Sequence, residues 1–357
     1  MHHRGKLVLL PPNRVWRTYP GGATLDRMAG VATPRDTHFA EDWIGSVTRS
    51  TIPGREQHYE GVSRVRVGGS EHDFRELLAS DPEYFLGTDH VQRHGPTPML
   101  LVKFLDSAIR LHFQCHPSRE FAQKFLNSPS GKTEAYHILG VREGVTDPYF
   151  YMGFQNPPSP ADLKRWIETQ DTAAMESCFE KIRVNVGDTF LIPGGFPHAL
   201  GEGVFMVEIQ EPTDFAVRYE FERAGYVLPE AARFMGRGMD FGLSLINFNR
   251  YPRDVIERDY RCRPQPLREV GGARQDLLIG PAQTPCFRVM KTHLSAPSTK
   301  AESSFHIGIV TSGACAITVG GETHHLRRYD KFFCPAGLPL GYVPSAACEI
   351  LECLPPA

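Results

Sequence analysis

The chain has 357 residues, 41% of them hydrophobic and 22% charged, which supplies enough apolar material for one large or two medium-sized domains. Its 39 Lys and Arg residues against 41 Asp and Glu residues leave a net charge of -2. The sequence therefore excludes the broad cationic surface that binds nucleic acids or anionic membranes. The 33 glycines and 29 prolines favour many turns and short strands over long helices.

The eight cysteines include no CxxC pair, and several lie within apolar runs, where a free thiol behaves as a small buried hydrophobe. The apolar run near the N-terminus covers only residues 7–10, which is too short for a signal peptide, and no later run is long enough to span a membrane. We therefore expect a soluble cytoplasmic protein with reduced cysteines, a monomer or a homodimer, that binds neither nucleic acid nor membranes.

In the first third of the chain, strand-like patterns give way to one helical segment. Residues 1–70 are rich in turns and show no helical periodicity. Apolar residues then recur at helical spacing, which predicts helix over about 72–87. The apolar run 99–105 predicts a buried strand, and residues 111–116 alternate between apolar and polar, as a strand with two different faces does.

The middle of the chain mixes short helices with strands. A short helix is predicted at 119–126, and the clearest helical region is 159–180, where Ser159 can cap the helix and Pro160 takes its first position. Strands are predicted at 133–141, 183–192 and 204–210.

The C-terminal part is set off by a polar, proline-containing stretch of mixed charge at 247–274. Short β segments separated by Gly and Pro follow it, and they predict a second, smaller barrel or sandwich. We therefore expect a first domain over 1–250 that includes both helical regions, a linker over 251–275, and a second barrel over 276–357.

The strongest local motif is a G-x5-P-x-G-x2-H pattern that runs from Gly187 to His198. It is typical of a turn, an apolar strand and a Pro/Gly corner that directs an imidazole into the mouth of a barrel. The pattern matches the second sequence motif of the cupin barrels.

A companion motif adds further metal-binding side chains. Gln114 and His116 are two apart on a predicted strand, so they share a face and can converge on one ion. Glu134 follows on the next strand. Any one of the 15 histidines would more often be a surface or core residue, but three separate segments agree. With His198 they form a mixed N/O set that suits Zn²⁺, with Mn²⁺, Fe²⁺ or Co²⁺ as alternatives.

Four segments of the chain, in this order and spacing, resemble the type I mannose-6-phosphate isomerases (phosphomannose isomerases), enzymes of the cupin superfamily. The segments are LVKFLDSAIRLHFQCHP, GKTEAYHIL, GDTFLIPGGFPHAL and EIQEPTDFAVRYEFER, within residues 97–223, with a weaker echo near the N-terminus in RVWRTYPGGATL and EDWIGS. The resemblance implies a mainly β fold with two cupin (jelly-roll) barrels and a small helical insertion. It also implies a metal-dependent aldose–ketose isomerase that interconverts mannose 6-phosphate and fructose 6-phosphate through an enediol.

The resemblance also implies roles for individual residues. The metal ligands would be Gln114, His116, Glu134 and His198. Arg218 matches a catalytic arginine, Asp214 an active-site carboxylate, and Lys132 a lysine that faces the sugar phosphate and the reacting carbons.

The chemistry itself needs a cation that stabilises the enediolate, a base that moves a carbon-bound proton, and an anchor for the phosphate. The candidate bases are Lys132, Asp214 and Glu211, and the candidate anchors are Arg119, Lys124 and Lys132. Which of the three acts as the base depends on pKa shifts that burial sets, so the sequence leaves all three as candidates. Equally, Arg218 and Asp214 could form a structural ion pair, and the lysines and Arg119 could be solvated.

Departures from the family pattern affect the sugar site rather than the metal. His112 stands where relatives usually have a serine that contacts the phosphate. Two alternatives therefore stay open: an isomerase or epimerase of a different sugar, phosphorylated or not, and a non-enzymatic sugar-binding cupin. In the second barrel, the corner at Pro335 and Gly337 leads to Leu340 at the ligand position, and His324 and His325 point to opposite faces, so we expect no metal there.

Overall fold

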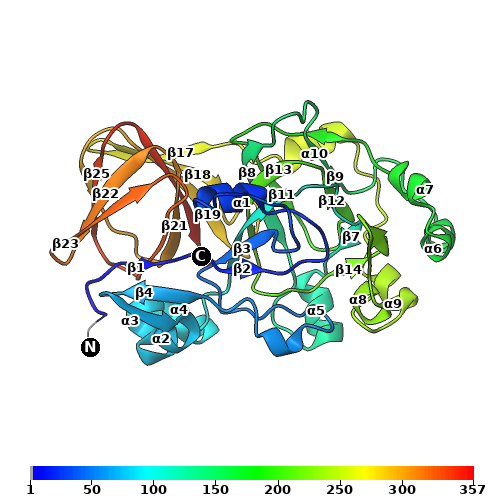
Figure 1. Cartoon of the computed structure of the whole chain (residues 1–357), viewed down its shortest axis with the longest axis horizontal. Helices are drawn as coiled ribbons and strands as arrows, with labels where there is room; N and C mark the ends of the chain where they lie inside the picture. The colour runs from blue at the N-terminus through cyan, green and yellow to red at the C-terminus, as the bar shows by residue number, and fades with distance from the viewer. Residues whose placement is uncertain (1–2) are drawn as a thin grey trace.

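The computed structural model describes residues 3–357, apart from the side chain of Val270, so the first two residues of the predicted first domain lie outside it. Antiparallel strands dominate the molecule; helices α6 to α9 lie at its right end in Figure 1, α2 to α4 lie at the lower left, and α1 lies near the centre. The mainly β architecture expected from the sequence is confirmed. No helix among the described residues is long and apolar enough to span a membrane. All eight cysteines are free and buried.

The first barrel is built from a six-stranded and a five-stranded sheet. The larger sheet has the order β11-β8-β13-β6-β3-β2 and the smaller one β10-β9-β12-β7-β14. The strands of the larger sheet are β2 (Arg14–Val15), β3 (Glu41–Ile44), β6 (Leu101–Asp106), β8 (Glu134–Val141), β11 (Thr189–Ile192) and β13 (Val204–Gln210). Those of the smaller sheet are β7 (Gln114–Cys115), β9 (Tyr149–Met152), β10 (Ile182–Arg183), β12 (His198–Leu200) and β14 (Val217–Arg218).

The C-terminal barrel combines a nine-stranded with a four-stranded sheet. Their orders are β17-β18-β19-β26-β21-β24-β1-β4-β5 and β20-β25-β22-β23. The strands of the nine-stranded sheet are β1 (Val8–Leu9), β4 (Arg64–Val67), β5 (Ser70–Asp73), β17 (Gln265–Val270), β18 (Ala273–Ile279), β19 (Arg288–Leu294), β21 (His306–Ser312), β24 (Lys331–Cys334) and β26 (Cys348–Leu354). Those of the four-stranded sheet are β20 (Ser298–Lys300), β22 (Ala314–Val319), β23 (Glu322–Arg327) and β25 (Leu340–Pro344).

Strand pairing crosses the domain boundaries that the sequence predicts. β1, from the start of the chain, pairs with β24 and brings β4 and β5 into the C-terminal sheet. The predicted linker carries helix α10 (Arg253–Asp259) and strand β17. α10 buries only Ile256, and β17 is an exposed edge strand, so both show the polar composition that is typical of a linker.

The predicted helical regions are confirmed, and five short helices outside them were missed: α1, α4, α8, α9 and α10. Residues 72–87 form α2 (Phe74–Ser80) and α3 (Pro82–Leu86), and α4 (Thr88–His94) follows; α5 (Arg119–Leu126) has the predicted bounds. Region 159–180 forms α6 (Pro160–Thr169), capped by Ser159, and α7 (Thr172–Glu176). The remaining elements are α8 (Glu230–Arg233), α9 (Met239–Ser244), a 3-10 turn (Glu56–His58), and the hairpin β15 (Glu222–Arg223) and β16 (Tyr226–Val227).

The expectation of no helix before residue 70 is wrong, because α1 (Ala23–Met28) forms there. Its six residues are too few to show a helical period in the sequence.

Alternation along β6 explains how the core positions a polar pocket. Val102 and Phe104 belong to a large apolar cluster that also contains Ile307 and Leu351 of the C-terminal sheet. The intervening Lys103 faces the opposite side, into the first barrel, because side chains alternate along a strand. The two barrels therefore pack through one face of the six-stranded sheet, and its other face carries the pocket.

Candidate metal centre and active pocket

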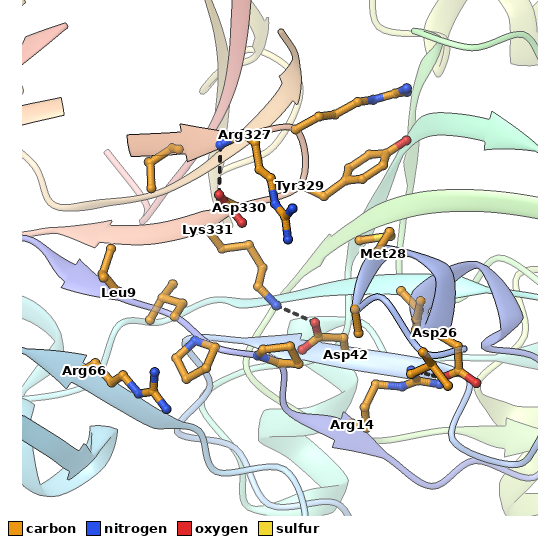
Figure 2. A pocket seen from close by; sticks show the side chains of 18 of the residues that line it. Leu9, Arg14, Asp26, Met28, Asp42, Arg66, Arg327, Tyr329, Asp330 and Lys331 are labelled. Carbon is orange, nitrogen blue, oxygen red and sulfur yellow. Dashed lines mark hydrogen bonds and ion pairs between the residues drawn. The ribbon is translucent and has the colours of Figure 1, made fainter. Parts of the chain in front are cut away.

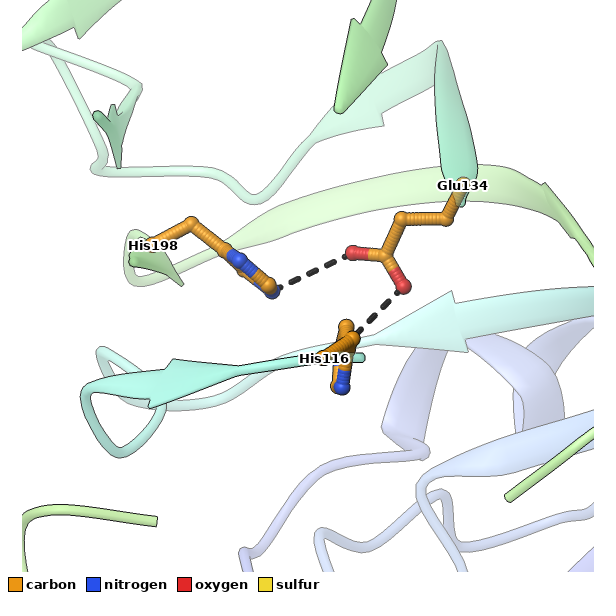
Figure 3. Close-up of side chains that lie close together, drawn as sticks. All are labelled: His116, Glu134 and His198. Atoms are coloured by element: carbon orange, nitrogen blue, oxygen red, sulfur yellow. Dashed lines mark ion pairs between the residues drawn. The ribbon is translucent and has the colours of Figure 1, made fainter. Parts of the chain in front are cut away.

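Two imidazoles and one carboxylate meet inside the first barrel. His116 Nε2 lies 3.3 Å from Glu134 Oε2, and His198 Nε2 lies 3.2 Å from Glu134 Oε1 (Figure 3). One ligand atom of each residue lies within 4.8 Å of the others, and all three side chains are buried. The structure thus brings together three of the four side chains that the sequence proposed as ligands.

Two glycines allow the three segments to approach one another. A Cβ atom on Gly194 would lie 2.6 Å from Ser118 Cα, and one on Gly131 would lie 2.5 Å from the Pro117 carbonyl oxygen. Because neither glycine has a side chain, the loops before His198 and Glu134 pack against the chain just after His116. Backbone hydrogen bonds then fix the junction: the amide of Gly195 donates to His116 and that of Lys132 to Pro117.

The orientation of His198 is set by its own loop. Its Nδ1 lies 2.8 Å from the carbonyl oxygen of Phe196. A carbonyl can only accept, so Nδ1 carries the proton and Nε2 presents a lone pair toward Glu134. This arrangement is typical of a histidine that ligates a metal through Nε2.

Gln114 completes the set from the neighbouring strand. It pairs with His198 across β7 and β12, and its side-chain amide lies 3.3 Å from His198 Nε2. The two ends of an amide are interchangeable by a flip, which would turn Oε1 toward the same centre. Two imidazole nitrogens, a carboxylate and an amide oxygen fit a divalent transition metal. Among the described residues, the Oε2 atom of Glu134 makes ion-pair contacts with His116 and Lys132 but no hydrogen bond.

Lys132 reaches the same centre from the side. Its ammonium lies 2.8 Å from His116 Nε2 and 3.1 Å from Glu134 Oε2. Burial and this lysine lower the pKa of His116 to about 3, so the imidazole is neutral at pH 7. Burial alone would raise the pKa of Glu134, but Lys132 and the two imidazoles lower it well below its usual value. The donors are therefore in the protonation states that bind a metal.

Beyond Lys132, buried charges of alternating sign line a pocket. Glu208 Oε1 lies 3.8 Å from Lys132 Nζ and 3.1 Å from Lys103 Nζ, and Lys103 lies 3.6 Å from Glu41. Lys103 is only 1% exposed, a degree of burial that lysine tolerates only when paired. Burial raises the pKa of Glu208, and the Glu134 charge adds to this against the opposing effect of Lys103.

Asp214 and Arg218 do not pair with each other, contrary to the structural alternative considered for them. Asp214 receives two hydrogen bonds from Arg17, at 3.0 and 3.2 Å, and one from the backbone amide of Thr51 at 3.0 Å. Burial would raise the pKa of Asp214, but Arg17 and Lys103 hold it below its usual value. Asp214 therefore lies beside the pocket as a fixed counter-ion of Arg17.

Arg218 is a buried guanidinium without an ion pair. It is 7% exposed, and its one hydrogen bond among the described residues is a long one, 3.4 Å, to the carbonyl of Ala232. Burial and the nearby Arg17 lower its pKa to about 10. Because an unpaired buried cation attracts an anion, Arg218 is available to bind an anionic group in the pocket.

His112 also lines the pocket. Its Nδ1 lies 3.0 Å from the carbonyl oxygen of Glu220, so Nδ1 carries the proton, and its Nε2 has no partner among residues 3–357. Burial and Arg218 lower the pKa of His112 to about 4. The residue therefore offers a neutral acceptor to the pocket, which suits a hydroxyl group better than a phosphate.

Arg119 and Glu211 are brought to each other rather than to the pocket. Arg119 lies 2.9 Å from Glu211, whose carboxylate also accepts from the backbone amides of Gly131 at 3.3 Å and Thr133 at 3.0 Å. Neither residue is among those that line the pocket. In this structure the two residues pair with each other and hold the loop that bears Lys132, so their predicted contact with the substrate stays a prediction.

Several pocket residues were not singled out from the sequence: Arg17, Tyr19, Glu41, Lys103, Tyr136 and Glu208. A usable signal was present, because Lys103 and Glu208 are lone charges inside otherwise apolar strands, a pattern that predicts a buried ion pair. The N-terminal echo segments contain Arg17 and Glu41, but nothing local indicates which of their side chains face the pocket.

Comparisons with known proteins agree with this site. No protein-family model matches the chain. The mannose-6-phosphate isomerase of Streptococcus mutans is 26% identical over 327 residues, which cover 90% of this chain and 89% of that protein. The mannose-6-phosphate isomerase ManA of Bacillus subtilis is 30% identical over 133 residues, 37% of this chain and 40% of that protein.

A solved structure shows the same fold. The crystal structure of the mannose 6-phosphate isomerase from Bacillus subtilis matches with a TM-score of 0.73 at 20% identity, covering 97% of this chain and 99% of that chain. The similarity first seen in four motifs thus extends over about 90% of the sequence. Over most of its length, the chain is similar in sequence and fold to proteins named mannose-6-phosphate isomerases.

Proposed function

We propose that this protein is a metal-dependent aldose–ketose isomerase that interconverts mannose 6-phosphate and fructose 6-phosphate through an enediol. The observation that carries the proposal is the buried group of His116, Glu134 and His198 beside Lys132, a residue that lines the same pocket as Arg218. Chemistry of this kind needs a cation, a base and an anion anchor, and the pocket contains residues suited to each.

We assign Gln114, His116, Glu134 and His198 as ligands of one Zn²⁺ ion. When bound there, the metal supplies a Lewis acid that polarises the sugar's oxygen atoms and stabilises the enediolate. The remaining steps fall to the side chains of the pocket.

The structure favours Lys132 over Asp214 as the group that moves the proton. Asp214 accepts three hydrogen bonds, and its pKa is held below the usual value, so it is a weak base. Lys132 lies next to the ligand group and to Glu208, a carboxyl with a raised pKa that can exchange a proton with it. We therefore assign the transfer between C2 and C1 to Lys132, which first gives its ammonium proton to the Glu208 carboxylate so that the neutral amine can take the C2 proton and return it to C1. Asp214 positions Arg17.

Arg218 is our candidate for the anion anchor. The pocket itself has a free volume of only about 20 Å³, about enough for one water molecule. A neighbouring cavity of about 250 Å³ shares Ala216 and Arg218 with it. Since Arg218 is held by one long hydrogen bond, its side chain can swing and join the two spaces. A sugar phosphate would then place its charged end against Arg218 and its carbonyl end near Lys132.

His112 favours a second candidate, an isomerase or epimerase of an unphosphorylated sugar. Its neutral Nε2 accepts a hydrogen bond and offers nothing to a phosphate oxygen. A third candidate is a sugar-binding protein without catalysis.

One experiment separates the three. Zinc-loaded protein is incubated in D₂O with mannose 6-phosphate or with mannose, and proton NMR follows the C2 proton and the ketose product. We expect exchange and fructose 6-phosphate formation with the phosphorylated sugar only. Turnover of mannose alone favours the second candidate, and binding without exchange favours the third.

A further inference from the structure

A separate cavity lies where the first barrel meets the C-terminal barrel. Its volume is about 660 Å³, within the range of about 300–1,000 Å³ that is usual for small-molecule sites. Strand β1, the segment after it, helix α1 and the turn between β23 and β24 enclose it, so it is built from both barrels (Figure 2). It shares no lining residue with the pocket proposed for the sugar.

Basic side chains outnumber acidic ones around this cavity. Five basic side chains and three carboxylates line it, an excess of two positive charges: Arg14, Arg66, Arg327, Arg328 and Lys331 against Asp26, Asp42 and Asp330. Asp26 pairs with Arg14 at 2.9 Å, and Asp42 pairs with Lys331. The third carboxylate, Asp330, accepts from the backbone amide of Arg327 at 2.8 Å and so closes the turn.

Two of the arginines have no partner of their own. Within residues 3–357, the guanidinium groups of Arg66 and Arg327 make neither an ion pair nor a hydrogen bond. In the view of Figure 2, the Arg327 guanidinium lies above the Lys331–Asp42 pair and the Arg66 guanidinium lies to its left. Both side chains are exposed on the wall of the cavity, and each free guanidinium group can donate two parallel hydrogen bonds to phosphate oxygens.

The rest of the wall is apolar. Leu9, Leu25 and Met28 contribute aliphatic surface, and Tyr329 contributes an aromatic ring. An apolar wall does not stabilise bound inorganic phosphate, but it can bury the uncharged part of a larger molecule. The combination therefore suits a phosphate carried on an apolar or aromatic body.

We propose that this cavity is a second ligand site, which binds an organic phosphate through Arg66 and Arg327 and packs its uncharged part against Met28 and Tyr329. The site is placed behind the proposed sugar pocket, since Asp42 on β3 faces the cavity while its neighbour Glu41 lines the pocket. The proposal concerns binding and does not depend on the isomerase assignment.

The test follows Met28 directly by NMR. The metal-loaded protein carries ¹³C-methyl methionine, and Met28→Leu identifies the Met28 signal. Phenyl phosphate, an aromatic phosphate that chelates metals weakly, is titrated at constant ionic strength, with inorganic phosphate and phenol in parallel. We expect a saturable shift of the Met28 signal with phenyl phosphate, and weaker binding of the other two compounds.

Two double variants give the decisive comparison. Arg66→Gln with Arg327→Gln removes the two unpaired guanidinium groups, and we expect the Kd for phenyl phosphate to rise at least about tenfold. Arg165→Gln with Arg258→Gln removes the same charge from exposed positions elsewhere and should leave the Kd unchanged. A Met28 signal that does not move, or equal Kd values in the two double variants, would overturn the proposal.

Discussion

Both barrels bury charged side chains between their sheets, but they supply the positive charge in different ways. In the first barrel, two imidazoles face Glu134, and Lys132 approaches from the side. In the second, Lys300 binds both carboxylate oxygens of Glu352, and it also lies 3.1 Å from Glu302. The carboxylate of the second barrel thus has a cation built into the chain.

The surroundings of Glu352 complete the contrast. Gln275 donates to it at 2.8 Å and Thr292 at 3.1 Å, so its oxygens are fully used. His306 is buried nearby, with no partner for either ring nitrogen among the described residues. In both barrels the buried carboxylate has a lysine partner, Lys132 in the first and Lys300 in the second. The difference is that two imidazoles also face Glu134, whereas Lys300, Gln275 and Thr292 occupy both oxygens of Glu352 and leave no position for a metal.

The largest expected effect comes from removing an imidazole of the first barrel. His116→Ala or His198→Ala should abolish metal binding at micromolar metal and reduce kcat by more than about 10³-fold, because one of four ligands is lost. Elemental analysis and the isomerase assay measure both quantities. His306→Ala is the matched control from the second barrel and should leave both unchanged. Full metal occupancy in His116→Ala would break the comparison.

Arg218→Ala should act on turnover without affecting the metal. It removes the unpaired buried cation from the pocket, and we expect kcat/KM to fall by about 10²–10³-fold, the usual scale for one electrostatic stabiliser. Metal content should equal that of the unmodified protein. If the metal were lost together with activity, Arg218 would belong to the metal site and the distinction between ligands and anchor would fail.

Lys300→Met tests the built-in cation. It leaves Glu352 buried without its counter-ion, and we expect the free energy of unfolding to fall by about 3–5 kcal/mol. Chemical denaturation measures this value. The double variant Lys300→Met with Glu352→Gln should recover most of the loss, because the neutral amide can still bond to Gln275 and Thr292. A single variant as stable as the parent protein would show that the pair is dispensable.

His306 gives a smaller, pH-dependent effect. Burial lowers its pKa to about 4, below the value of about 6.5 for an unfolded chain. The unfolded state therefore binds the proton first, so His306 costs stability as the pH falls from about 6.5 to 4, by about 1.4 kcal/mol per pH unit. His306→Asn should flatten the dependence of unfolding free energy on pH in that window by this amount. An unchanged slope would mean that His306 is not buried in the neutral form.

Much of the fold follows from local patterns. Helix α5 and strand β13 have the predicted bounds, because each has a clear period and a clear start or stop. α1 was missed since six residues show no period, and the pairing of β1 with β24 joins residues more than 300 positions apart, which no local pattern encodes. The polar character of β17 reflects its place at a sheet edge, which depends on tertiary structure.

In the candidate site, too, local patterns predicted some residues, and contacts between distant parts of the chain decide the others. The metal-binding group could be predicted because strand alternation and the Pro/Gly corner specify where His116, Glu134 and His198 point. The partner of Asp214 could not, because Arg17 lies almost 200 residues earlier in the chain. Likewise, Glu211 is a free base in the sequence but a clamp for Arg119 in the structure.

Anomalous diffraction at the zinc edge, from crystals grown with Zn²⁺, tests the central claim most directly. The account predicts one strong peak in the first barrel, about 2.0–2.1 Å from the Nε2 atoms of His116 and His198 and at a similar distance from the Glu134 carboxylate, with no peak beside Glu352. A first barrel without that peak, or a peak at Glu352 instead, would contradict it.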